Sequence, residues 1–128
     1  MNLERLRGKT GEMKATNIHR LAWVLVIALV SNVARAQDLK KERQSLFACY
    51  ATEAVLRGSQ SCDPPTTLLD AVFEKCFAHE RAFQIALLHL RPGDVVFAQT
   101  VIKHVRERMS PRIQRAIRHV QTGSGQCS

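Results

Sequence analysis

Two cysteines constrain the fold of this chain more than any other feature. Cys49 lies on the apolar side of one helix-like segment, Cys76 lies on the apolar side of the next, and Pro64-Pro65 stands between them. Consecutive prolines stop a helix, because each lacks an N–H group and its ring clashes with the preceding turn. The two segments are therefore expected to form a helical hairpin whose arms the cysteines can join.

The first helix of this hairpin is predicted over residues 38–57. Asp38 is its expected N-cap, and Gly58 is expected to be the first residue beyond its C-terminus. The apolar residues at helical spacing are Leu39, Leu46, Cys49 and Leu56.

The second helix is predicted from Thr66 or Thr67 to about Leu90. Its apolar side is expected to contain Leu69, Val72, Phe73, Cys76, Phe77, Phe83, Leu87 and Leu90.

A third helix is predicted after the turn Arg91-Pro-Gly-Asp94, with Asp94 as its N-cap. Ser110-Pro111 then either starts a new helix over residues 111–120 or kinks a continuous one. The apolar spacing from Val95 to Met109 continues in phase through Ile113, which favours the kink. Residues 121–128 are rich in Gly and Ser and are expected to form a flexible tail.

These elements predict an all-α fold, a small up-down-up three-helix bundle held by disulfides. No segment alternates apolar and polar residues over the length of a strand, and short connections make successive helices antiparallel. Cys49 and Cys76 then lie at the same level of the hairpin, which favours their pairing and leaves Cys62 for Cys127. Two alternatives stay open: Cys49 and Cys76 as buried thiols, and Cys127 bonded to a second copy in a dimer.

An export signal is predicted over residues 1–36. Leu21–Val30 is an apolar run of ten residues, preceded by Lys14, His19 and Arg20 and followed by Ala34-Arg-Ala36. This order is typical of a signal peptide that ends before Gln37, with Met13 as an alternative start; a retained membrane anchor is the competing interpretation. The predicted mature part, 37–128, is one domain with four cysteines, an even count that suits the periplasm or the extracellular space.

Residues typical of catalysis or metal binding are sparse in the mature part. Cys76 and His79 share a helix side, but a zinc site needs three or four converging ligands, so no metal and no cofactor is expected. Glu53 and Glu80 are the candidate half-buried carboxylates. Such a pair is able to do acid–base work, but ion pairs with Arg81 or His79 are favoured. No catalytic residues are assigned, and the prediction leans away from an enzyme.

The strongest functional feature is the basic side of the third helix. From residue 103 to 118 the chain carries six cations and one acid, Glu107, while the 13 Lys and Arg and 9 Asp and Glu of residues 37–128 give only +4 in total. The six cations are Lys103, Arg106, Arg108, Arg112, Arg115 and Arg118.

Three interpretations compete for these cations: a solvated surface, adhesion to anionic lipid or an acidic envelope polymer, and docking to an acidic protein. A nucleic-acid partner is not expected, because export removes the chain from most nucleic acid. The sequence favours an exported binding or accessory module that presents its basic helix to an acidic partner or envelope component. The alternatives are a peripheral membrane protein that binds anionic lipid and a small enzyme with an unrecognised site.

Overall fold

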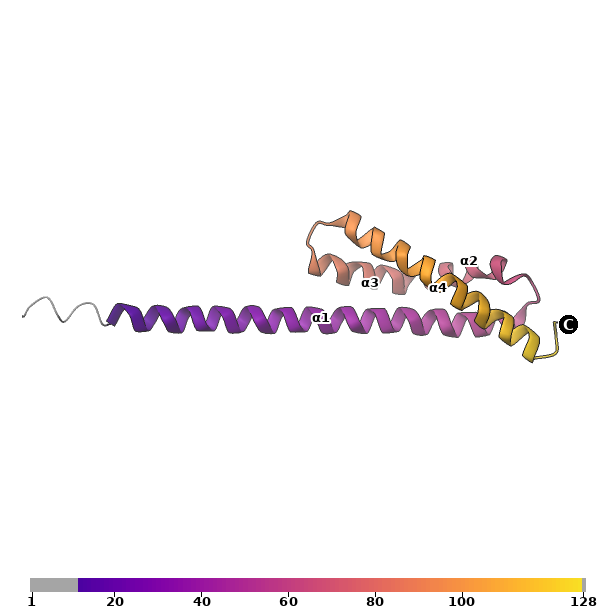
Figure 1. The fold of residues 1–128 in the computed structure, drawn as a ribbon, viewed down its shortest axis with the longest axis horizontal. Coiled ribbons are helices and arrows are strands. Elements are labelled where there is room, and N and C mark those ends of the chain that lie inside the picture. Colours follow the sequence, from indigo (N-terminus) through magenta and orange to yellow (C-terminus); the bar gives the residue numbers. More distant parts are fainter. Residues whose placement is uncertain (1–11, 128) are drawn as a thin grey trace, which may run out of the picture. The chain divides into compact units, whose positions relative to one another are not determined.

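The computed structural model describes residues 12–127, and within that range it contains four α-helices and no strand (Figure 1). They are α1 (Glu12–Gln60), α2 (Pro65–Lys75), α3 (Phe77–Leu90) and α4 (Val95–Gly123). The all-α prediction is confirmed, but the helix count is four rather than three. The chain divides after Ala36 into two compact units. Residues 1–11 of the predicted signal peptide lie outside the described residues.

In the N-terminal unit, α1 is apolar and exposed on all sides. Every described side chain from Asn17 to Ala36 is exposed, and Leu21 and Trp23 keep 63% and 66% of their surface open. By length and composition this part of the helix is able to cross a membrane, and its place near the N-terminus is also that of a signal sequence.

The second unit begins at Gln37, and both predicted ends of its first helix are wrong. Asp38 lies inside α1 instead of capping it, because α1 continues without a break from Glu12 to Gln60. Gly58 is also inside the helix and is buried. A Cβ atom at Gly58 would lie 2.9 Å from the carbonyl oxygen of Ile117, so this glycine allows close packing of α1 against α4.

The expected second helix is in fact two helices that meet at Cys76. The backbone of Cys76 has φ −90° and ψ 7°, which ends α2 at Lys75 and starts α3 at Phe77. Cys76 N–H still donates to the carbonyl of Val72, and the carbonyl of Cys76 accepts from Glu80 N–H, so hydrogen bonds connect the turn to both helices. The turn changes the phase of the apolar pattern, and Phe77, expected in the core, is 53% exposed.

The third predicted helix corresponds to α4, which begins as expected. Asp94 Oδ1 accepts a hydrogen bond from Phe97 N–H at 3.0 Å, which confirms the N-cap. Pro111 lies inside the helix, so the alternative of a separate helix over residues 111–120 is wrong. The helix also continues past residue 120 to Gly123, and Gln121 Nε2 donates to the carbonyls of Ser61 and Asp63 at 2.9 and 2.8 Å.

One apolar core lies between the helices of this unit. Its members are Leu46, Tyr50, Ala54, Leu68, Val72, Phe73, Cys76, Phe83, Leu87, Ala98, Ile113 and Ile117. Tyr50 and Phe73 meet edge to face with their ring centres 5.4 Å apart. Leu56, expected in the core, is 41% exposed, and the fully buried Tyr50 was not among the predicted core residues.

Both predicted disulfides are present. Cys49 bonds to Cys76 and Cys62 bonds to Cys127, with Cα–Cα distances of 5.9 and 5.4 Å. The first bond joins α1 to the α2–α3 junction, and the second joins the α1–α2 loop to the residues after α4. The alternative of buried free thiols is therefore wrong for Cys49 and Cys76, and the pairing of Cys127 is within the chain.

Candidate functional site

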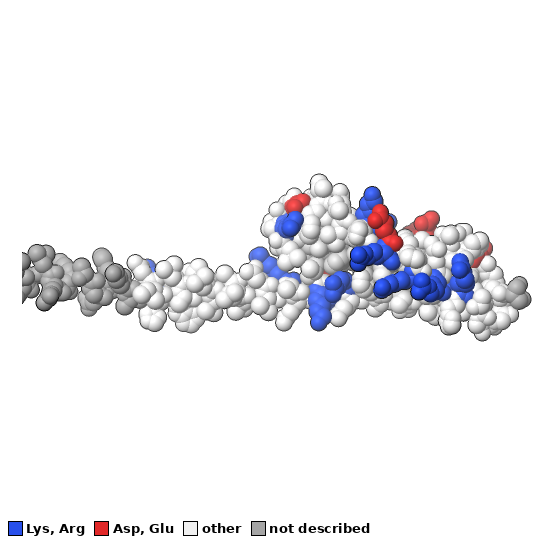
Figure 2. Space-filling view, viewed as in Figure 1, with Lys and Arg blue, Asp and Glu red and all other residues white. Residues whose placement is uncertain are grey.

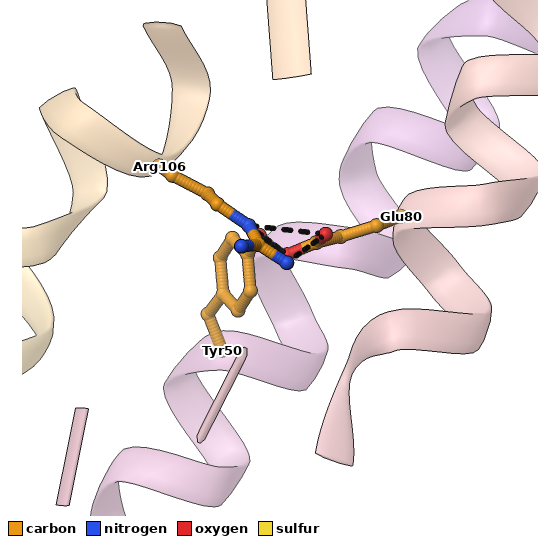
Figure 3. A network of polar contacts seen from close by, with 3 residues as sticks. All are labelled: Tyr50, Glu80 and Arg106. Atoms are coloured by element: carbon orange, nitrogen blue, oxygen red, sulfur yellow. Dashed lines mark hydrogen bonds and ion pairs between the residues drawn. The ribbon is translucent and has the colours of Figure 1, made fainter. Parts of the chain in front are cut away.

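A network of three polar side chains, Tyr50, Glu80 and Arg106, joins α1, α3 and α4 (Figure 3). The hydroxyl of Tyr50 donates to Glu80 Oε1 at 2.7 Å. Arg106 donates from Nη2 to Glu80 Oε2 at 2.6 Å and from Nε to both carboxylate oxygens at 2.9 and 3.1 Å. Both oxygens of this buried carboxylate are thus engaged, which satisfies the charge inside the bundle.

The electrostatics of the network keep Tyr50 neutral and Arg106 charged. The pKa of Tyr50 is raised well above its ordinary value. Burial of the hydroxyl is the largest cause, and the hydrogen bond to Glu80 is the second. The hydrogen bonds to Glu80 also raise the pKa of Arg106. The guanidinium carbon of Arg106 lies 5.0 Å from the centre of the Phe73 ring, so an aromatic face supports the same cation.

The partners expected for Glu80 were wrong. Arg81 or His79 was expected, but the ion pair of Glu80 is to Arg106, which is 26 residues away in the chain. Glu53 has a local partner instead, since Glu53 Oε2 lies 3.7 Å from Arg57 Nε. The participation of Tyr50 was missed, although its place four residues after Leu46 and four before Ala54 puts all three on one side of a helix.

An open groove of about 420 Å³ lies between α3 and α4, and Glu80 and Arg106 of this network form part of its lining. Its lining residues are Phe77, Glu80, Arg81, Gln84, Gln99, Ile102, Lys103, Arg106, Glu107 and Ser110. Glu80 is held by Tyr50 and Arg106, and no histidine is part of this lining, so the described groove has no acid–base pair of carboxylate and imidazole.

The cysteine considered as a metal ligand is not available for one. Cys76 is bonded to Cys49, and its sulfur therefore cannot act as a thiolate ligand. Within residues 12–127 no group of three His, Cys, Asp or Glu side chains is arranged to hold a metal ion.

The six predicted cations of the basic side fall into three groups. Arg106 is committed to Glu80, and its side chain is only 41% exposed. Lys103 Nζ lies 4.0 Å from Glu107 Oε1, and His104 approaches the same carboxylate. The remaining four are exposed, and no carboxylate of the described chain lies within 4.0 Å of them: Arg108, Arg112, Arg115 and Arg118.

These four arginines form what we term the arginine stripe (Arg108, Arg112, Arg115 and Arg118). Steps of three and four residues place them along one side of α4, opposite the buried Ile113 and Ile117. Figure 2 shows the Lys and Arg side chains gathered along α4. From Arg108 to Arg118 the stripe extends about 15 Å at 1.5 Å per residue.

The structure thus separates a structural arginine, which holds α4 to its neighbours, from a stripe of arginines that have no described acidic partner within the chain. Comparison with known proteins adds no relative to this description, because no protein family, curated protein or solved structure matches the chain.

Proposed function

We propose that this protein is an exported binding module that presents the arginine stripe of α4 to an acidic protein. The observation that carries the proposal is that Arg108, Arg112, Arg115 and Arg118 are exposed and lack a described carboxylate within 4.0 Å. A row of exposed guanidinium groups attracts an acidic surface and orients it for binding.

The rigidity of α4 supports this proposal. Just before the stripe, Arg106 is held by its ion pair with Glu80. Beneath the stripe, Ile113 and Ile117 are buried in the core. After the stripe, Gln121 donates a hydrogen bond to the α1–α2 loop. The backbone that carries the four arginines is therefore fixed at several points along its length. A fixed array of cations loses less conformational entropy on binding than a flexible basic tail would.

Export is supported by two features of the chain. The exposed apolar helix of the N-terminal unit suits a membrane or the export machinery, and both disulfides are compatible with an oxidising compartment. The periplasm and the extracellular space both meet this requirement, and α4 would meet its partner there.

The direct test measures binding to an acidic polypeptide. Labelled poly-L-glutamate is titrated with the wild type, with Arg112→Gln/Arg115→Gln/Arg118→Gln, and with a control that loses the same charge, Lys40→Gln/Lys41→Gln/Arg43→Gln on α1. The stripe variant is expected to bind several-fold more weakly, while the control binds like the wild type. Equal weakening of the two variants would show an effect of net charge alone and would overturn the proposal.

The partner can be identified by photocrosslinking. A photoreactive residue replaces Arg115 in one protein and the exposed Val55 of α1 in another, and each is expressed in exporting cells. Crosslinked products specific to position 115, lost in high salt and carrying acidic peptides at the link, are the expected result. The same products from both positions, or peptides without acidic residues, would count against an acidic partner.

A further inference from the structure

The turn between α3 and α4 forms an apolar tip at one end of the bundle. In residues 37–127 seven large apolar side chains are more than 40% exposed, and three of these lie within seven residues at this turn. Leu90 ends α3 with 41% of its surface exposed, while Val95 and Val96 start α4 with 47% and 74% exposed. We call these three residues the aliphatic tip.

The aliphatic tip lies at the same end of the bundle as residue 37, the first residue of the second unit. The Cys49–Cys76 bond places those two residues side by side, and α3 then runs about 21 Å from Cys76 to Leu90 at 1.5 Å per residue. Residue 37 lies about 18 Å before Cys49 along α1. Because α1 and α3 run in opposite directions, residue 37 and Leu90 are on the same side of the Cys49–Cys76 bond. Figure 1 shows the turn between α3 and α4 at this end.

Exposed cations lie a short distance behind the tip. Lys40, Lys41 and Arg43 are exposed on α1, about 8–12 Å from the level of the tip along the helix axis. A fourth cation, Arg91, is in the turn itself and stacks on the Phe97 ring at 4.2 Å. The acids of the same region are Asp38, Glu42 and Asp94, so the cations exceed them by one.

This arrangement fits a lipid bilayer better than a second protein. A stable protein interface buries about 800 Å² on each partner, far more than three aliphatic side chains supply. A membrane surface accepts apolar side chains about 5–10 Å into the boundary between headgroups and acyl chains, with lysine and arginine at the level of the headgroups. The separation of about 8–12 Å between the tip and these cations is comparable with that depth. The excess of one cation makes the preference for anionic lipid modest, so the aliphatic contacts supply most of the binding.

The order of the chain gives an independent argument for lipid. The bundle begins at this end with Gln37, seven residues after the end of the apolar stretch Leu21–Val30, which has the length and composition to lie in a membrane. We propose that the aliphatic tip inserts into the headgroup boundary of a bilayer that contains anionic lipid. This proposal uses a different surface from the arginine stripe and shares with the proposed function only the expectation of export.

The chain allows a clean fluorescence test, because Trp23 is its only tryptophan. In a Trp23→Phe background, Val96→Trp places one reporter in the tip, and Val55→Trp places a matched reporter at an exposed position of α1. The protein is used as recovered from exporting cells, with its N-terminus identified by mass. Vesicles contain equal parts phosphatidylglycerol and phosphatidylcholine, with or without brominated acyl chains.

Position 96 is expected to show a blue shift of emission and quenching by the brominated lipid, whereas position 55 shows neither. The comparison of positions 96 and 55 is valid whether or not the N-terminal helix is retained. A retained apolar helix would bring both variants to the vesicle equally, so any difference in quenching between them reports the depth of the reporter. Arg112→Gln/Arg115→Gln/Arg118→Gln in the same background should leave the quenching at position 96 unchanged, which separates this test from that of the proposed function. Val95→Ser should reduce it.

Two results would overturn the proposal. Quenching that is equal at positions 96 and 55, or absent at both, would show that the tip is not the part of the protein that inserts into the bilayer. A blue shift at position 96 without lipid, growing with protein concentration, would assign the tip to contact between copies of the chain. Unchanged circular dichroism of each variant excludes misfolding as the cause.

Discussion

Gly58 and Ile117 bring the backbones of α1 and α4 into direct contact. A Cβ atom at position 58 would lie 2.9 Å from the carbonyl oxygen of Ile117 and 3.2 Å from its Cα. The neighbour is backbone, which cannot move aside as the end of a flexible side chain can. The contact therefore sets how closely the two longest helices approach.

Gly58→Ala is expected to destabilise the protein. Alanine raises helix propensity by about 1 kcal/mol relative to glycine, but overpacking a core costs about 1–3 kcal/mol, and a backbone neighbour places this site at the upper end. The net loss should be about 1–2 kcal/mol, measured by urea unfolding. Gly123→Ala is the matched control, since a Cβ there meets no atom within 4 Å, and it should be neutral or stabilising. Equal midpoints for the two variants would contradict the close contact.

Tyr50 should make stability fall at alkaline pH. Because the folded pKa of Tyr50 is raised, the unfolded chain loses its proton first, near its ordinary value of about 10. Its contribution is fully present below that pH and declines by about 1.4 kcal/mol per pH unit above it. Tyr50 is the only tyrosine, so absorbance at 295 nm should rise only together with the loss of helical circular dichroism. Ionisation well before unfolding would show that Tyr50 is open to solvent.

Glu80 and Arg106 should be energetically coupled. Arg106→Gln leaves a carboxylate buried, with 4% of its side chain exposed, whereas Glu80→Gln leaves a guanidinium that is 41% exposed and still hydrated. Arg106→Gln should therefore be the more damaging change. The double variant should lose less than the sum of the single variants, with a coupling energy of about 1–3 kcal/mol in chemical unfolding. Additive losses would mean that the ion pair contributes nothing of its own.

The two disulfides should contribute unequally, in the opposite order to their loop lengths. Loop closure alone gives about 3.6 kcal/mol for Cys49–Cys76 and about 4.4 kcal/mol for Cys62–Cys127. Cys76 is fully buried in the core, however, while Cys62 is exposed. Cys49→Ala/Cys76→Ala should therefore lower the melting temperature more than Cys62→Ala/Cys127→Ala, because it also removes packed atoms. The reverse order would favour the loop-entropy account.

Local sequence rules predicted the features of this bundle that depend on neighbouring residues. Helical periodicity and the antiparallel order of short connections were enough to pair Cys49 with Cys76, and a capping residue was enough to start α4 at Asp94. The break at Cys76 could not be predicted in this way, because no glycine or proline marks it. The residue at the break is the one that is bonded to α1.

Two residues show why the rest of the site could not be predicted. Gly58 follows an apolar helical pattern and so resembles a helix stop, but its role comes from a contact with Ile117 at the other end of the chain. Arg106 lies seven residues, or about two helical turns, before the buried Ile113, so spacing places it on the buried side of α4, but its partner Glu80 is known only once α3 packs beside it. In both cases the deciding partner is distant in sequence, and helical spacing carries no information about it.

The bond between Cys62 and Cys127 also determines how the protein responds to mechanical load. It joins the residues after α4 to the loop at the end of α1. A pulling force applied at the C-terminus therefore passes through this bond into α1, and the segment between the two cysteines, with all of α4, bears no tension. If the C-terminus is tethered, the helix that carries the arginines stays folded under loads that would unwind it in the reduced protein.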